Sequence, residues 1–119
     1  KLTLLTTNAQ GVMRGFHADR IRWRMLTCVA GEIRHVLGNP KTQQSIRHHL
    51  TPEGPSLLWR PGIASAYYVL SEQASALYHV SDVYRPGEQH TYRWTYFGLD
   101  IWEPMKHTVI ISKRDREAA

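Results

Sequence analysis

The sequence predicts an α+β domain in which helices of the first half pack on an antiparallel sheet formed by the second half. Three observations predict this fold. Apolar residues recur at helical spacing before Gly38, a stretch rich in proline and glycine follows at 51–62, and β-branched and aromatic residues dominate after Ala66. Because 119 residues is an ordinary length for one domain, residues 1–119 are expected to share a single core.

The chain is expected to begin with an irregular segment over residues 1–16 that includes a short helical start. Thr7 and Gln10 have the spacing of a helix capping box. Gly11 and Gly15 follow closely and disfavour a longer helix.

The longest predicted element is an amphipathic helix over 17–37, within a helical half that spans 17–50. Gly38 and Pro40 are typical of a helix end, and Pro40 also begins a shorter second helix that runs to Leu50. The apolar side of the long helix carries Ile21, Met25, Leu26, Cys28, Val29, Ile33, Val36 and Leu37.

Two residues of this predicted helix project into its apolar side for different reasons. Arg22 is expected to pair with the carboxylate of Asp19, which lies three residues earlier. Cys28 is the only cysteine, so it has no partner for an internal disulfide, and its apolar position favours a core thiol over a catalytic one.

The sheet half is predicted over 63–113 as a meander of about three to four antiparallel strands, because the connections are short. A short extended piece at Leu57–Trp59 precedes it. The last residues, 114–119, are charged and expected to be frayed. The predicted strands cover 66–70, 76–84, 90–99 and 108–112.

Arginine accounts for 11 of the 15 basic residues, and the net charge is +5. The planar guanidinium group matches phosphate bidentately and stacks on bases, so this bias favours an anionic partner. We therefore predict a small basic nucleic-acid-binding module without catalytic activity, although the polar side of the helix also fits an ordinary solvated face. The residues predicted to contact nucleic acid are Arg14, Arg20, Arg24, Arg34, Arg85, Arg93, Tyr92 and Trp94.

The stacking role of the aromatic residues depends on which face of their strand is exposed. His90, Tyr92, Trp94 and Tyr96 alternate onto one face of the strand predicted over 90–99. Aromatic strand faces are usually buried, so packing of this row under the long helix is the favoured interpretation.

Seven histidines suggest a second hypothesis, a metal-independent ribonuclease. Such an enzyme needs one group to accept the 2′-hydroxyl proton, another to protonate the leaving oxygen, and a cation to stabilise the charged phosphorane. A third hypothesis is a protein-interaction or inhibitor domain anchored by the four tryptophans and six tyrosines. The candidate catalytic residues of the ribonuclease are His48, His79, His90, Tyr92 and Arg93.

Several recognisable sites are absent from the sequence. It has no HExxH motif, paired cysteines, GxSxG elbow or phosphate-cradling glycine loop, so no cofactor and no metal are expected. A metal site across His79, His90 and Asp82 is the less favoured alternative. No apolar run approaches the ~18 residues that cross a bilayer, so no membrane contact and a cytoplasmic location are expected. The oligomeric state is not predicted.

Overall fold

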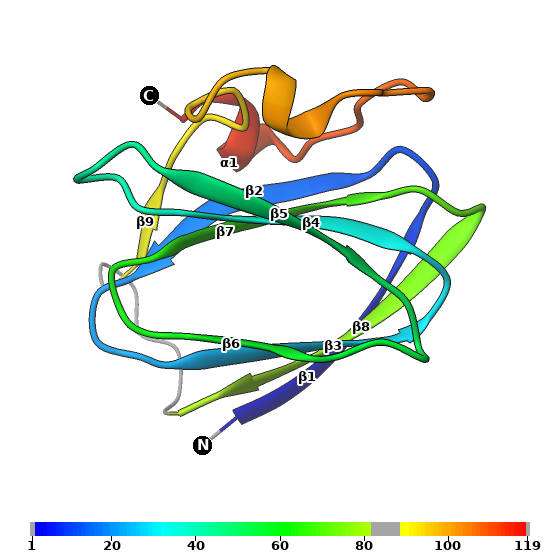
Figure 1. The fold of residues 1–119 in the computed structure, drawn as a ribbon, viewed down its shortest axis with the longest axis horizontal. Coiled ribbons are helices and arrows are strands. Elements are labelled where there is room, and N and C mark those ends of the chain that lie inside the picture. The colour runs from blue at the N-terminus through cyan, green and yellow to red at the C-terminus, as the bar shows by residue number, and fades with distance from the viewer. Residues whose placement is uncertain (1, 82–88, 119) are drawn as a thin grey trace.

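The computed structural model describes residues 2–81 and 89–118, which form nine strands in two antiparallel sheets that face each other (Figure 1). Consecutive strands lie in opposite sheets except for β4 and β5, which gives a jelly-roll-like β-sandwich. The four-stranded sheet has the order β1 (Leu2–Ala9), β8 (Gln73–Val80), β3 (Arg24–Ala30), β6 (Leu57–Trp59). The five-stranded sheet has the order β5 (Ser45–Leu50), β4 (Ile33–Gly38), β7 (Ala64–Val69), β2 (Met13–Asp19), β9 (Gln89–Thr91).

The segment that follows β9 lies over the outer face of the five-stranded sheet (Figure 1). It contains the two helical turns of the described chain, η1 (Asp100–Trp102) and α1 (Lys113–Arg116). Within the described ranges, no helix has the length and apolar character needed to cross a membrane.

The predicted α+β fold with its long N-terminal helix is wrong, because the described chain is nearly all β. The predicted helical half, 17–50, contributes the end of β2 and then β3, β4 and β5. In β4, Ile33 packs between the sheets, whereas Val36 packs into a second apolar cluster on the outer face. A strand buried on both faces loses the alternation of apolar and polar residues, so its sequence resembles a helical stripe.

The meander predicted over 63–113 is also wrong, because β7 and β8 lie in different sheets. The strand predicted over 90–99 ends at Thr91. In place of the strand predicted over 108–112, the structure has one isolated bridge at Ile110. The alternation of β-branched and aromatic residues therefore indicated extended chain but not which sheet each segment joins.

Both ends of the described chain are more ordered than the sequence suggested. Residues 1–16 were expected to be irregular, but β1 and the start of β2 occupy most of them. The tail over 114–119 was expected to be frayed, but it includes most of α1 and the buried carboxylate of Asp115. The extended piece at Leu57–Trp59 is confirmed as β6.

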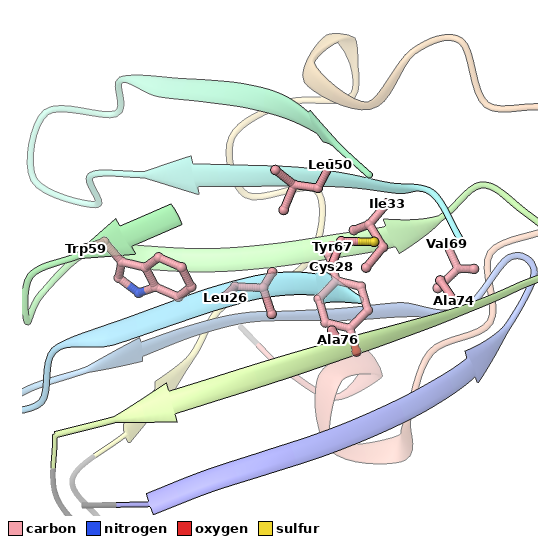
Figure 2. Close-up of a cluster of buried hydrophobic side chains, with 9 residues drawn as sticks. All are labelled: Leu26, Cys28, Ile33, Leu50, Trp59, Tyr67, Val69, Ala74 and Ala76. Atoms are coloured by element: carbon pink, nitrogen blue, oxygen red, sulfur yellow. The ribbon is translucent and has the colours of Figure 1, made fainter. Parts of the chain in front are cut away.

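Two apolar clusters hold the sandwich together. The first fills the space between the sheets (Figure 2), and the second lies under the C-terminal segment. Trp102 is fully buried in the second cluster, and its indole Nε1 donates a hydrogen bond to the carbonyl of Trp94 at 2.9 Å. This bond links two parts of the C-terminal segment, and the Trp102 ring packs 5.9 Å from that of Phe16 on β2. The first cluster comprises Leu26, Cys28, Ile33, Leu50, Trp59, Tyr67, Val69, Ala74 and Ala76.

Two predictions about buried residues of the supposed helix are confirmed. Arg22 Nη1 donates to Asp19 Oδ1 at 3.0 Å, and both side chains are buried. The second carboxylate oxygen of Asp19 accepts from Arg24 Nε at 2.9 Å. Cys28 lies in the first cluster, where burial raises the pKa of its thiol. The thiol is therefore part of the core.

His35 on β4 is buried without a hydrogen bond to either ring nitrogen. Its ring lies 5.2 Å from that of Trp59, and His48 faces it across the strand pair β4–β5. Burial, and secondarily the charge of His48, lower the pKa of His35 from 6.5 to about 3. The folded chain therefore holds this imidazole in its neutral form.

This burial makes folding stability dependent on pH. Between pH 6.5 and about 3, the unfolded chain holds a proton on His35 that the folded chain lacks. The contribution of neutral His35 to the free energy of unfolding is therefore fully present above pH 6.5. It falls on acidification, by roughly 1.4 kcal/mol per pH unit between pH 6.5 and about 3. We expect His35→Leu to flatten the pH dependence of the urea midpoint, relative to the exposed control His107→Ala. Parallel pH profiles for the wild type and His35→Leu would contradict this account.

Candidate active site

A cavity of ≈ 260 Å³ opens between the two sheets. It is smaller than three other hollows of the described chain, of ≈ 760, ≈ 470 and ≈ 310 Å³, but its wall carries a histidine bound to a buried carboxylate. We therefore identify it by its chemistry and not by its size. Its lining residues are Leu2, Leu4, Thr6, Arg14, His17, Arg24, Ser65, Tyr78, Val80, Gln89 and Arg114.

The central contact of this cavity joins His17 of β2 to Asp115 of α1. His17 Nε2 lies 2.7 Å from Asp115 Oδ1, and the side chains are 20% and 4% exposed. The other carboxylate oxygen accepts a hydrogen bond from the backbone N–H of Gly15 at 3.1 Å. The hydroxyl of Ser112 caps α1 by accepting from the Asp115 N–H at 3.2 Å. The carboxylate is therefore held on both of its oxygens.

A bulge in β2 directs His17 into the cavity. In the pairing with β7, Gly15 lies opposite Ala66 and His17 lies opposite Ser65, so Phe16 is the extra residue. The Phe16 side chain is fully buried in the second cluster. An extra residue shifts the alternation of a strand, so Arg14 and His17, three positions apart, both line the cavity. Gly15 has φ 109°, a conformation that side-chain-bearing residues rarely adopt.

The hydrogen bond to Asp115 determines which ring nitrogen of His17 is free. Nε2 also lies 3.0 Å from Arg114 Nη2, but one nitrogen cannot donate to the carboxylate and accept from the guanidinium together. The shorter, charge-assisted bond to Asp115 places the proton on Nε2. Nδ1 is then the unprotonated nitrogen, and the described residues provide no hydrogen bond to it.

Asp115 is ionised at neutral pH despite its position. Burial alone raises the pKa of this carboxyl, but the hydrogen bond and charge of His17 oppose burial. The Gly15 N–H and the positive charge of Arg114 add to that opposition, and together these groups bring the pKa below its usual value. The carboxylate of Asp115 therefore places a negative charge beside the His17 ring.

Three arginines, Arg14, Arg24 and Arg114, line the cavity and make it electropositive. Arg14 donates from Nε and Nη2 to Asn8 Oδ1 at 3.1 and 2.7 Å. Arg24 donates from Nε to Asp19, and its Cζ lies 5.7 Å from the ring centre of Tyr78. Because a guanidinium group has five N–H donors, both Arg14 and Arg24 keep donors for a ligand after these contacts. An anionic ligand therefore finds fixed positive charges around it.

Tyr78 lies on β8, in the sheet that faces β2. Burial, and secondarily the neighbouring Tyr67, raise the pKa of its phenol, although Arg24 and Arg14 oppose the shift. The hydroxyl therefore stays protonated near neutral pH. It can donate a hydrogen bond to an oxygen atom in the cavity.

Comparison with known proteins identifies the family. The family model described as dTDP-4-dehydrorhamnose 3,5-epimerase matches residues 3–119. The chain belongs to the dTDP-4-dehydrorhamnose 3,5-epimerase family. The epimerase of Pseudomonas aeruginosa is 29% identical over 118 residues, which cover 92% of this chain and 65% of that protein. The epimerase of Mycolicibacterium smegmatis is 30% identical over 122 residues, 95% of this chain and 60% of its own length.

Solved structures agree with this assignment. The 4-keto-6-deoxy sugar epimerase NovW of Streptomyces spheroides superimposes with a TM-score of 0.89 at 22% identity, over 99% of this chain and 63% of that one. The epimerase of Legionella pneumophila, solved with dTDP-4-keto-L-rhamnose, gives 0.86 at 25% identity, over 99% and 67%. The chain thus spans between 60% and 67% of the length of these four relatives.

Membership of an epimerase family overturns the predicted functions. The predictions of a non-catalytic nucleic-acid-binding module, a ribonuclease and an inhibitor domain are wrong, because the matching proteins are sugar-nucleotide epimerases. The composition indicated an anionic partner but not its class.

The structure separates most residues that were predicted to bind nucleic acid. The active-site cavity brings Arg14 and Arg24 together. Arg34 lies on β4, where its guanidinium donates to the backbone carbonyl of Trp102 in the C-terminal segment. Arg85 lies outside the described residues. The remaining four lie in the turn after β2 and in the chain after β9: Arg20, Tyr92, Arg93 and Trp94.

The aromatic row predicted over 90–99 does pack into the core, although no helix covers it. Tyr92 and Trp94 are partly buried against the second cluster. Arg93, between them, is exposed. That Tyr92, Arg93 and Trp94 contact a ligand stays a prediction.

The histidines of the ribonuclease hypothesis do not converge. His48 on β5 and His90 on β9 lie at opposite edges of the five-stranded sheet. His79 on β8 belongs to the other sheet, where its Nδ1 lies 3.3 Å from the hydroxyl of Thr3. Asp82, named for a metal site, lies outside the described residues. In residues 2–81 and 89–118, no three histidine, cysteine or carboxylate residues group closely enough to hold a metal ion. The expectation of no metal and no cofactor stays a prediction.

Sequence reasoning missed both His17 and Asp115. His17 was assigned to a helix start and Asp115 to a frayed tail, and 98 residues separate them. One local signal was present: Ser112 and Asp115 have the spacing of a capped helix start. That signal predicts the turn α1 but not the strand that it contacts.

The bulge at Gly15 is predicted to be essential for this geometry. A Cβ atom at Gly15 would lie 2.5 Å from the Ser65 carbonyl oxygen and 2.8 Å from the Ala66 Cα, in addition to the strain of its positive φ. At Gly98 φ is 92° and a Cβ would meet no atom within 4 Å, so Gly98→Ala measures the strain alone. We expect Gly15→Ala to lower the free energy of unfolding by roughly 1–3 kcal/mol more than Gly98→Ala in urea titrations. Equal losses would show that the close contact with β7 is unimportant.

Proposed function

We propose that this chain is a sugar-nucleotide epimerase that inverts a carbon atom next to the keto group of a dTDP-linked 4-keto-6-deoxy sugar. The relatives are 3,5-epimerases, and C3 and C5 are the two ring carbons that flank the C4 carbonyl. The Legionella relative holds a dTDP-4-keto sugar. The observation that carries the proposal is the His17–Asp115 pair in the wall of an electropositive cavity.

The chemistry requires a base that works near neutral pH. A hydrogen on a carbon next to a carbonyl is acidic, because its removal places the negative charge on the carbonyl oxygen as an enolate. In the proposed step, His17 Nδ1 takes this proton, the C–H electrons form a carbon–carbon double bond, and the carbonyl oxygen becomes an oxyanion. Return of a proton to the opposite face of the carbon inverts its configuration.

Asp115 acts through His17. Its carboxylate fixes the ring orientation, holds the proton on Nε2 and stabilises the imidazolium that forms when Nδ1 accepts a proton. The Gly15 N–H keeps the second oxygen occupied, so the carboxylate presents one oxygen to the ring. Asp115 is therefore a positioning residue.

The arginines supply the charge that the substrate and the enolate need. Arg14, Arg24 and Arg114 all line the cavity, and the diphosphate of a dTDP-sugar and the developing oxyanion are both negative. Tyr78 lines the same space from the opposite sheet. A sugar placed between the sheets thus has His17 on one side and a neutral hydrogen-bond donor on the other.

The cytoplasmic location stays a prediction, as does the single domain over residues 1–119.

Solvent exchange tests the proposal directly. During incubation with dTDP-4-keto-L-rhamnose in heavy water, the wild-type chain is expected to incorporate deuterium at C3, at C5 or at both, as measured by proton NMR. His17→Asn should slow incorporation by about 10²–10⁴-fold, because it removes the base. His79→Asn, which changes a histidine outside the cavity, should exchange at the wild-type rate. No exchange by the wild type, or full exchange by a folded His17→Asn, would refute the function.

A further inference from the structure

A second hollow lies on the other side of β2 from the active site. Its volume is ≈ 470 Å³, and it shares no lining residue with the cavity around His17. Ala18 lines this hollow and His17 lines the cavity, as expected for neighbouring residues of a strand. The two spaces are therefore separate. We refer to the second as the outer hollow.

Three cationic side chains from three different turns line the outer hollow. Arg20 follows β2, Lys41 lies between β4 and β5, and Arg60 lies between β6 and β7. His90 and Tyr92 form another part of its wall, with ring centres 4.4 Å apart. Residues far apart in the sequence thus place positive charge around one space.

Carboxylates of the described chain do not neutralise these cations. Asp19 is the one carboxylate that lines the outer hollow, and its two oxygens already bind Arg22 and Arg24. No described carboxylate lies within ion-pair distance of Arg20, Lys41 or Arg60. Like charges that share a hollow repel each other, so an anion bound between them is favoured.

Backbone hydrogen bonds hold the turns that carry these residues. The N–H of Gly62 donates to the Asp19 carbonyl at 2.7 Å, which ties the turn before β7 to the end of β2. The N–H of Lys41 donates to Asn39 Oδ1 at 2.9 Å, and the N–H of Gln43 donates to the Asn39 carbonyl at 2.8 Å. The backbone positions that carry these exposed side chains are therefore set before a ligand arrives, which lowers the part of the entropy cost of binding that comes from ordering the turns.

We propose that the outer hollow binds the phosphate group of a small phosphorylated molecule, at a site distinct from the active site. Two guanidinium groups each present a fork of N–H donors, and the lysine adds a third positive charge. A phosphate dianion offers three terminal oxygens and two charges, whereas a carboxylate offers two oxygens and one charge. The number of donors therefore favours phosphate.

Titration of the wild-type chain with inorganic phosphate and with glucose 1-phosphate at low ionic strength, followed by backbone amide NMR, tests this site. Saturable shifts at the amides of Lys41 and Gly62 are expected, because both residues line the outer hollow. Tighter binding of glucose 1-phosphate identifies a phosphate ester as the ligand, and tighter binding of the inorganic ion identifies free phosphate. Shifts confined to Gly15 and Asp115 would place the anion in the active site and overturn the proposal, as would the absence of saturable shifts.

Charge-matched variants separate a specific site from general attraction. Arg20→Ala with Lys41→Ala should weaken phosphate binding at Gly62 at least tenfold. Arg93→Ala with Lys106→Ala removes the same charge from exposed positions outside the hollow, so it should retain the wild-type affinity. Equal weakening in both double variants would overturn the proposal. Deuterium incorporation by the Arg20 and Lys41 variant should stay at the wild-type rate, which distinguishes failure of this site from failure of the epimerase.

Discussion

The hydrogen bond between His17 and Asp115 is the interaction on which the site depends, and much of the fold serves to form it. The two residues are 98 positions apart, so neither local propensity nor a short turn brings them together. The second apolar cluster, with Trp102 at its centre, fixes the C-terminal segment over the five-stranded sheet. The bulge in β2 then directs His17 and the Gly15 N–H toward the same carboxylate. Loss of either support separates the base from its positioning group.

The buried carboxylates of this interior are compensated by cationic groups and hydrogen-bond donors. Asp19 and Asp115 are both buried, and each is paired with cationic or hydrogen-bond donor groups. Of the arginines beside these carboxylates, Arg24 and Arg114 also line the cavity. Under the proposed function, a negatively charged sugar nucleotide would meet positive charge without displacing a structural ion pair, and the oxyanion formed by proton removal would meet the same charge.

The sequence predicted parts of this structure that depend on neighbouring residues. The pairing of Arg22 with Asp19, the buried thiol of Cys28 and the extended piece at Leu57–Trp59 all follow from local patterns, and all three are confirmed. The long helix failed because the segment 17–37 contains strands from both sheets, and one of them is buried on both faces. Spacing alone does not distinguish such a segment from an amphipathic helix.

The candidate active site could not be predicted from local sequence patterns, for a related reason. The arginine bias favoured a negatively charged partner, but the class of such a partner depends on which side chains share a cavity. Seven histidines gave many candidates, and the topology of the sheets places His48, His79 and His90 on three separate strands. His17 stands apart from them because a carboxylate from the far end of the chain reaches it.

The tautomer of His17 is the most direct test of this account. Nitrogen-15 NMR of histidine-labelled protein reports which ring nitrogen carries the proton, and the exposed His107 serves as an internal reference for an unconstrained ring. The account predicts that neutral His17 is protonated at Nε2, with a strongly downfield proton bound to Asp115, and that Nδ1 is unprotonated. Protonation at Nδ1 would contradict it, because the nitrogen assigned as the base would then already carry a proton.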